Sequence, residues 1–168
     1  MWYVIQVPTG REEQIIEETK AYGVTPYYEE LFSPRCERKR KYLGEWHLES
    51  ELLFPGYLFV ITSRAEELYR ALKRIPRLTR LVGTGEKWTS MSPDDIHLVE
   101  LLTGPDRTAH FSEGYIKEGK VTVTSGPLKG LEDKICRIDR HKRLAWLEVK
   151  LVERRVEVMA GLEIVRKE

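Results

Sequence analysis

The 168-residue chain lacks several features that would assign it to a particular class of protein. Its two cysteines, Cys36 and Cys136, lie far apart without CxxC spacing, which excludes a disulfide framework and is typical of a reducing, cytoplasmic location. No apolar run approaches the roughly 18 residues of a membrane-spanning helix, and the N-terminus shows no signal peptide. The net charge of +1 gives no overall polyanion-binding signature.

The sequence also lacks the patterns of a catalytic or metal site. The histidines, His47, His97, His110 and His141, are scattered, and none stands at metal-ligand spacing from a cysteine. GxSxG and HExxH are absent, and the glycine-rich segment 83–87 departs from the phosphate-loop pattern GxxxxGK[ST]. We therefore predict no enzymatic activity, no cofactor and no metal.

What the chain does have is a short apolar and aromatic run over residues 52–60, LLFPGYLFV. The residues after its Pro-Gly break predict a central strand entered through a turn. Phe54 and Tyr57 flank that turn and are not expected both to face inward, so some aromatic area should be exposed for a partner. The competing interpretation is plain core packing, and alternation places Leu58 or Phe59 in the core.

The first part of the chain alternates strands and helices. Strands are predicted over 2–7, 27–32, the segment after Tyr57, and 78–82. Helices are predicted to begin at Thr9, which forms a capping-box pattern with Glu12, at Ser63, and at Ser92 before Pro93. The basic tract 35–41 is interpreted as a flexible hairpin or loop that is either simply solvated or in contact with nucleic acid. This order predicts an α+β domain, a βαββαβ-like antiparallel sheet with helices, over residues 1–104.

After a linker at 105–112, residues 113–168 show the pattern of strands alone, which predicts a small all-β barrel. Ala145, Leu147, Val149 and Leu151 alternate toward one face, with Trp146 on the other. This part holds 13 basic and 10 acidic residues. Concentrated cations beside an outward aromatic favour phosphate binding and base stacking, hence RNA, over a merely solvated hairpin. The candidate RNA-binding residues are Lys129, Lys134, Arg137, Arg140, His141, Lys142, Arg143, Trp146, Arg154 and Arg155.

Three segments of the first part, WYVIQVPTGRE, FPGYLFV and IPRLTRLVGTGEK, resemble the N-terminal domain of NusG-type transcription elongation factors. EGKVTVTSGPLKG and the terminal LEIVRKE resemble the KOW domain, an SH3-like barrel, that follows it in that family. The resemblance covers nearly the whole chain. It implies a non-enzymatic elongation factor, acting as a monomer in the cytoplasm, whose first domain binds the clamp helices of RNA polymerase. The implied polymerase-binding residues are Gln6, Phe54, Pro55, Gly56, Tyr57 and Phe59.

The second domain departs from the family at one turn. NusG-type KOW domains typically carry Ile-Phe-Gly-Arg there, whereas this chain has Leu151, Val152, Glu153 and Arg154. This departure argues against coupling through ribosomal protein S10 or to Rho. It makes the chain more similar to a specialised antitermination paralog of the LoaP or RfaH kind, whose KOW domain would bind an RNA hairpin in a nascent transcript. In the family the segment matching 35–41 lies near upstream DNA. The alternative is a ribosome-associated KOW protein that binds rRNA.

Overall fold

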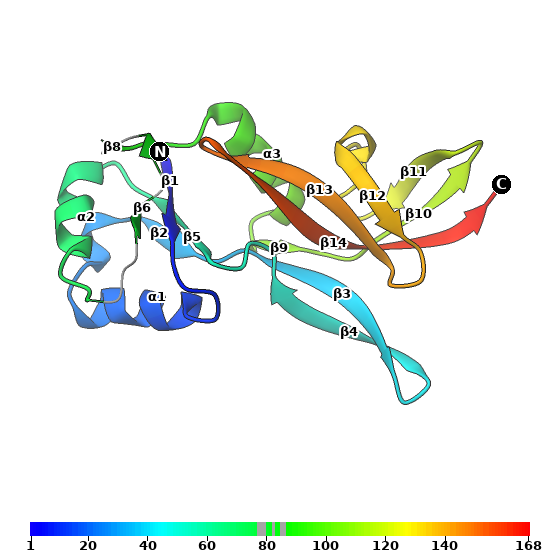
Figure 1. Ribbon diagram of the computed structural model, residues 1–168, viewed down its shortest axis with the longest axis horizontal. Helices are drawn as coiled ribbons and strands as arrows, with labels where there is room; N and C mark the ends of the chain where they lie inside the picture. The colour runs from blue at the N-terminus through cyan, green and yellow to red at the C-terminus, as the bar shows by residue number, and fades with distance from the viewer. Residues whose placement is uncertain (77–79, 82, 85–86) are drawn as a thin grey trace. The chain divides into compact units, whose positions relative to one another are not determined.

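The computed structural model describes residues 1–76, 80–81, 83–84 and 87–168. The chain forms two compact units, each assembled from non-contiguous segments. One unit consists of Met1–Ser33, Phe54–Ile96 and Lys150–Arg154, and the other of Pro34–Leu53, His97–Val149 and Arg155–Glu168. The fold is α+β, as predicted, with the elements drawn in Figure 1.

The first unit is built on an antiparallel sheet with the strand order β2-β5-β1-β6. Central strands β1 and β5 pair with Val4 opposite Phe59 and Gln6 opposite Tyr57. The elements of this unit are β1 (Trp2–Gln6), α1 (Glu12–Ala21), the 3₁₀ turn η1 (Thr25–Tyr27), β2 (Glu30–Phe32), β5 (Tyr57–Ile61), α2 (Ala65–Leu72), β6 (Arg80–Leu81), β7 (Gly83–Thr84) and β8 (Lys87–Trp88). Helix α3 (Pro93–Thr103) begins here.

Alternation along β1 and β5 gives this sheet two apolar faces. On one face, Tyr3, Ile5 and Leu58 form a buried cluster with Ile15 of α1 and Leu68 of α2. On the other face lie the aromatic side chains of the sheet, which contact one another edge-on or stacked. This aromatic cluster consists of Trp2, Phe32, Phe54 and Phe59. The middle residues of β1 and β5 are therefore buried on both faces.

Helix starts differ in two respects from the sequence pattern. The helix predicted to begin at Ser63, α2, begins at Ala65 after Arg64, with no side-chain cap. Ser92 caps α3 as predicted, because its Oγ accepts a hydrogen bond from the backbone N–H of Asp95 at 3.2 Å. The capping box of Thr9 and Glu12 is wrong: α1 begins at Glu12 after Arg11, with no side-chain cap. The Glu12 carboxylate turns back instead to the backbone N–H groups of Gly10 and Gly56.

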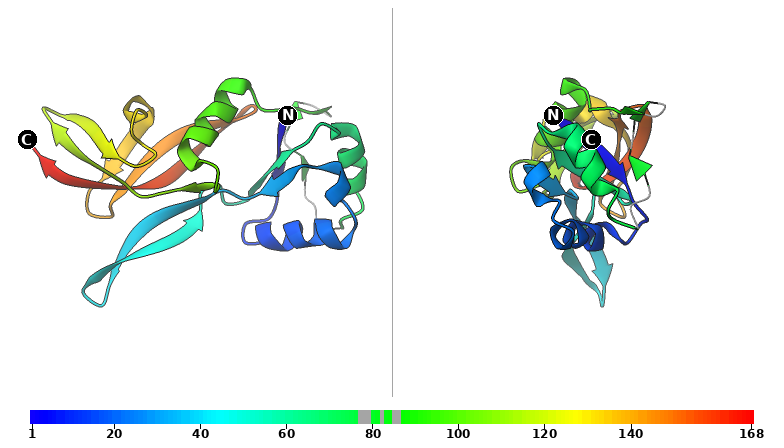
Figure 2. Two further views of the ribbon diagram at one scale, coloured as in Figure 1. Left: turned by 180° about the vertical axis from the view of Figure 1, so that it is seen from behind. Right: turned by 90° about the vertical axis from the view of Figure 1, so that its left-hand side faces the viewer.

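The basic tract 35–41 forms one strand of a regular hairpin in the second unit. Strand β3 (Arg35–Tyr42) pairs with β4 (Glu45–Leu52) over eight residues each. Leu43 and Gly44 make the connecting turn with φ of 53° and 77°, the two positive values of a type I′ turn. Figure 2 shows this cyan β3–β4 hairpin as a two-stranded ribbon ending in that turn. The tract is thus an ordered strand.

The rest of the second unit belongs to a five-stranded sheet with the order β11-β10-β14-β13-β12, of which residues Lys150–Arg154 are counted with the first unit. Leu147, Val149 and Leu151 are fully buried, which confirms the predicted alternation along β13. The pairs β10–β11 and β12–β13 are antiparallel, and β10 pairs with β14 in parallel. The elements are β10 (Ser112–Lys117), β11 (Lys120–Ser125), η2 (Glu132–Lys134), β12 (Ile135–Asp139), β13 (Leu144–Leu151) and β14 (Arg154–Lys167).

The predicted linker at 105–112 contains a short strand, β9 (Thr108–Ala109), which pairs in parallel with Arg35 and Cys36 of β3. The predicted strand over 78–82 and the glycine-rich segment 83–87 lie partly outside the described residues. Within the described ranges, no helix is long and apolar enough to cross a membrane.

Candidate protein and nucleic-acid interfaces

The segment Phe54–Tyr57 is a tight turn, here called the aromatic turn, with mixed exposure. Phe54 and Phe59 are both 0 % exposed, and their rings lie 5.0 Å apart in the aromatic cluster. Phe54 and Tyr57 were not expected both to face inward, and Phe54 is the one that does, because its ring packs against Phe59 of β5. Pro55 is exposed and Tyr57 is half-buried. The surface of the turn is therefore provided by Pro55 and Tyr57.

The aromatic turn is fixed by backbone contacts on both sides. The Tyr57 N–H donates to the Phe54 carbonyl at 3.1 Å, and the Val7 N–H donates to the Gly56 carbonyl at 2.8 Å. Gly56 has a φ of 87°, a value typical of the third residue of a type II turn, and a Cβ there would lie 3.1 Å from Oγ1 of Thr9. These contacts present Pro55 and Tyr57 in one defined orientation.

Glu12 is the side chain that ties helix α1 to this turn. It is 1 % exposed, and its Oε1 accepts the Gly56 N–H at 2.7 Å while Oε2 accepts the Gly10 N–H at 3.0 Å. A carboxylate at the first residue of a helix also benefits from the positive end of the helix dipole. The capping-box pattern pointed to Glu12, but Glu12 acts by accepting a hydrogen bond from Gly56, which is 44 positions away in the sequence.

Gln6 lies opposite Tyr57 on the neighbouring strand. Its Oε1 accepts a hydrogen bond from Nη1 of Arg154 at 2.9 Å. Gln6 and Arg154 had been assigned to different candidate sites, polymerase and RNA respectively, and both belong to the first unit. Arg154 is therefore placed with the aromatic-turn residues.

The second candidate interface centres on Arg140–Arg143, a four-residue basic turn between β12 and β13. Asp139 holds it, since its Oδ1 accepts the Lys142 backbone N–H at 2.9 Å, and this hydrogen bond lowers the pKa of the Asp139 carboxyl. Arg143 has a φ of 55°, a conformation that glycine or asparagine adopts at lower cost. Arg143 therefore occupies a position of the turn at which the backbone conformation favours glycine or asparagine.

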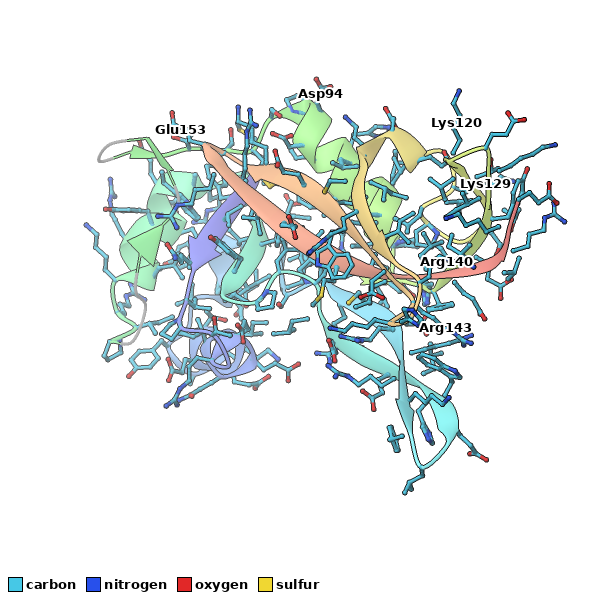
Figure 3. The ribbon with its side chains drawn as sticks, turned by 45° about the vertical axis from the view of Figure 1, so that its right-hand side comes forward. Asp94, Lys120, Lys129, Arg140, Arg143 and Glu153 are labelled. Carbon is cyan, nitrogen blue, oxygen red and sulfur yellow. The ribbon has the colours of Figure 1, made fainter. Side chains whose placement is uncertain are left out.

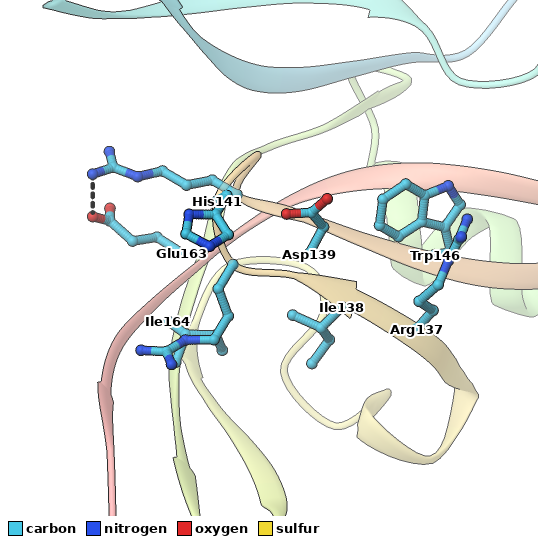
Figure 4. A pocket seen from close by; sticks show the side chains of 9 residues that line it. Arg137, Ile138, Asp139, His141, Trp146, Glu163 and Ile164 are labelled. Atoms are coloured by element: carbon cyan, nitrogen blue, oxygen red, sulfur yellow. Dashed lines mark ion pairs between the residues drawn. The ribbon is translucent and has the colours of Figure 1, made fainter.

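The basic turn borders a hollow of about 720 Å³, the first hollow. Figure 4 shows Trp146 and Arg137 side by side, and the Arg137 guanidinium lies 4.1 Å from the centre of the Trp146 ring. Arg143 pairs with Glu163 at 3.3 Å. Five predicted RNA-binding residues line this hollow, namely Arg137, Arg140, His141, Arg143 and Trp146.

A second hollow of about 710 Å³ is lined by His141, Lys142 and Trp146 together with residues of the β3–β4 hairpin. Among the hairpin residues, Trp46 was not singled out from the sequence. Lys41 belonged to the basic tract 35–41, but nothing in the sequence placed that tract beside the basic turn. The structure brings the two together within the second unit.

The remaining RNA candidates lie outside both hollows. Lys129, labelled in Figure 3, is exposed in the turn that follows β11, and Lys134 is exposed in η2. Arg155 pairs with Glu148 at 3.4 Å. Within the described ranges, no group of three or more acidic, histidine or cysteine side chains is arranged to hold a metal ion.

The comparisons with known proteins agree with one another. A family model described as "Transcription termination factor nusG" matches residues 1–100, more than half of the chain. The chain belongs to the NusG family. NusG-family proteins are non-enzymatic transcription factors, and the family resemblance drawn from FPGYLFV and the flanking motifs is confirmed.

The curated relatives match over most of their length. The transcription termination/antitermination protein NusG of Campylobacter jejuni is 26% identical over 94% of this chain and 91% of its own. The Thermus thermophilus protein of the same name is 24% identical over 94% and 92%. A solved structure titled "Domain interaction in Thermotoga maritima NusG" superposes with a TM-score of 0.58 and 22% identity, covering 95% of this chain and 92% of that one. The fold and the class, a transcription termination/antitermination factor, are thereby shown.

Proposed function

We propose that this NusG-family protein is a processive antitermination factor that binds RNA polymerase through the aromatic turn and a structured RNA through the basic turn. The proposal rests on two surfaces that are accessible to partners. One is the fixed turn with exposed Pro55 and half-buried Tyr57, and the other is the basic turn beside Trp146. A factor that binds the closed, processive polymerase more tightly than the open form shifts the equilibrium toward it.

The polymerase contact is assigned to Tyr57, Pro55 and Gln6, with the clamp helices as the partner. Aromatic side chains at the centre of an interface typically contribute a large share of the binding free energy. Phe54 and Phe59 support the turn from the core, and Gly56 permits its backbone conformation. In this proposal residues 1–104 bind the polymerase, residues 105–112 are a linker, and the KOW domain at 113–168 binds the RNA.

The RNA contact is assigned to the side chains around the first hollow. Arginine bridges phosphates and reads guanine in a bidentate manner, while an indole ring stacks on an exposed base. Arg140 is exposed and, within the described ranges, forms no ion pair, so its charge is available to a phosphate. This arrangement fits a specialised paralog of the LoaP or RfaH kind in the cytoplasm, acting as a monomer and recruited by a hairpin in the nascent transcript.

The polymerase contact is tested with Tyr57→Ala in a pull-down with core RNA polymerase. We expect a loss of about 2 kcal/mol, roughly a 30-fold weaker affinity, because an interfacial aromatic anchor is removed. Tyr22→Ala, which removes an exposed tyrosine at the end of α1, is the matched control and should bind as the wild type does. Unchanged binding of a natively folded Tyr57→Ala protein would refute the assignment.

The RNA contact is tested by titrating the full chain against transcript hairpins at two salt concentrations. Affinity should fall steeply with salt, because cations that bind phosphates release counterions. Arg140→Ala should weaken binding by about 1–3 kcal/mol if Arg140 reads a base, and less if it touches only a phosphate. Equal, weak binding of every RNA together with no effect of Arg140→Ala would show that the five-stranded sheet binds protein instead.

A further inference from the structure

The β3–β4 hairpin and the basic turn are two walls of the second hollow. Lys41, Tyr42 and Trp46 line it from the hairpin, and His141, Lys142 and Trp146 line it from the five-stranded sheet. Lys41 and Trp46 are cross-strand partners, so their side chains lie on the same face of the hairpin. On that face Lys39 contacts Glu163 of β14, and Glu37 contacts His110 in the segment between β9 and β10. The hairpin therefore directs an aromatic ring and a cation toward the basic turn.

Direct contacts hold the two walls in place. The Arg143 guanidinium of the basic turn lies 3.9 Å from the centre of the Trp46 ring. Lys39 pairs with Glu163 of β14 at 3.4 Å and lies over the Phe111 ring at 4.3 Å. At Gly161 the two backbones approach so closely that a Cβ would lie 2.5 Å from the Glu37 carbonyl oxygen. The second hollow is consequently a built feature of this unit.

The charges around the second hollow are mainly positive and partly uncompensated. Glu163 pairs with both Lys39 and Arg143. Lys41 and Lys142 are exposed, and neither forms an ion pair within the described ranges. A surface with unpaired cations on both walls attracts a polyanion and can contact its phosphates from two sides.

The two hollows adjoin, because His141 and Trp146 line both of them. Trp146 is half-buried and carries Arg137 on the side of the first hollow, as Figure 4 shows. Each hollow, at about 720 and 710 Å³, lies in the size range of sites that take a small organic molecule, and a nucleotide is of that size. The arrangement thus offers two nucleotide-sized spaces that share one indole ring, Trp146, with a second indole, Trp46, on the hairpin wall.

We propose that the RNA site extends onto the β3–β4 hairpin and takes an unpaired RNA segment, with neighbouring nucleotides in the two hollows and Lys41 and Trp46 as part of the binding surface. The inference rests on the proposed RNA-binding function and specifies its ligand. Paired bases hide their faces in the stack, and the major groove of A-form RNA is too narrow for side chains. Unpaired bases can stack on aromatic side chains while cations follow the backbone.

The test is an affinity titration of the full chain with three labelled probes: an RNA hairpin with a loop of about ten unpaired uridines, a paired RNA duplex of equal phosphate number, and the same hairpin in DNA. We expect the looped RNA to bind about tenfold more tightly than the duplex. Lys41→Ala and Trp46→Ala should each weaken looped-RNA binding by roughly three- to tenfold and change duplex binding less. Lys120→Ala, which removes an exposed lysine on β11, is the charge-matched control and should have no effect.

The outcomes separate this inference from the function on which it rests. If Arg140→Ala weakens binding but Lys41→Ala and Trp46→Ala do not, the hairpin wall is refuted and the RNA function is retained. If the duplex binds as tightly as the looped RNA, the preference for unpaired nucleotides is refuted, and tighter binding of the DNA hairpin would refute RNA as the ligand. If no probe binds the wild-type chain, the proposed RNA function itself fails. Lys41→Ala keeps the test decisive should Trp46→Ala disturb Arg143.

Discussion

Replacing Glu12 with alanine should destabilise the first unit and loosen the aromatic turn. The carboxylate is buried and accepts hydrogen bonds from the backbone N–H groups of Gly56 and Gly10. In the Glu12→Ala protein the Gly56 N–H loses its partner inside the structure. Water cannot reach it without opening the turn, because Gly56 itself is buried.

The size of the effect follows from the two hydrogen bonds. A hydrogen bond to a charged group contributes about 1.5–3 kcal/mol, and a buried donor left without a partner costs about 1–3 kcal/mol. The Gly10 contact is at an exposed residue and adds less. We therefore expect a loss of about 3 kcal/mol in the free energy of unfolding. With a urea m-value of about 2 kcal/mol per molar, the unfolding midpoint would fall by about 1.5 M.

The assay is urea unfolding followed by circular dichroism at 222 nm, which reports the helices. Glu66→Ala is the matched control, since it removes an exposed glutamate from the first turn of α2. Glu12→Gln should lie between wild type and Glu12→Ala, because it keeps one acceptor oxygen. The reasoning is refuted if Glu12→Ala and Glu66→Ala unfold within about 0.5 kcal/mol of each other, the range of ordinary surface substitutions.

Further predictions concern titratable groups and packing in the second unit. Hydrogen bonds to the carboxylates of Asp106 and Glu37 raise the pKa of His110 above its unfolded value. His110→Gln should therefore lower the free energy of unfolding by its full amount below about pH 6. This difference from the wild type should vanish as pH rises through the raised pKa of His110. Burial raises the pKa of Cys36 to about 11, so iodoacetamide at neutral pH should label exposed Cys136 first; equal rates would contradict this. Gly161→Ala should weaken looped-RNA binding in the same titration, since its Cβ would push β3 away; unchanged affinity with native unfolding would contradict it.

Much of the fold followed from local patterns, because these patterns report local physics. The alternation at Leu147 and Val149 identified the buried face of β13, and Ser92 marked the start of α3. Which of Phe54 and Tyr57 faces inward was left open, because alternation along a strand says nothing about a residue before a turn. The burial of Phe54 results from contact with Phe59 across the Pro-Gly break.

The site was predictable only in part. The basic turn was visible as a cluster in the sequence, since its members are consecutive. The second hollow was not, because Trp46 and Arg143 meet only after the hairpin packs on the five-stranded sheet. Glu12 and Gly56 are likewise separated by 44 positions, a pairing that no local pattern encodes.

The β3–β4 hairpin leaves the first unit and returns to it at nearly the same point, so it can be replaced as one segment. Its two ends meet, because the Leu53 N–H donates to the Pro34 carbonyl at 2.8 Å. The strands on either side, β2 and β5, are already paired with each other through Phe32 and Phe59. A segment that leaves and returns at one point can change in length or sequence at little entropic cost to the sheet it interrupts. A hairpin with other side chains could therefore be grafted here to redirect ligand choice while the support of the aromatic turn stays the same.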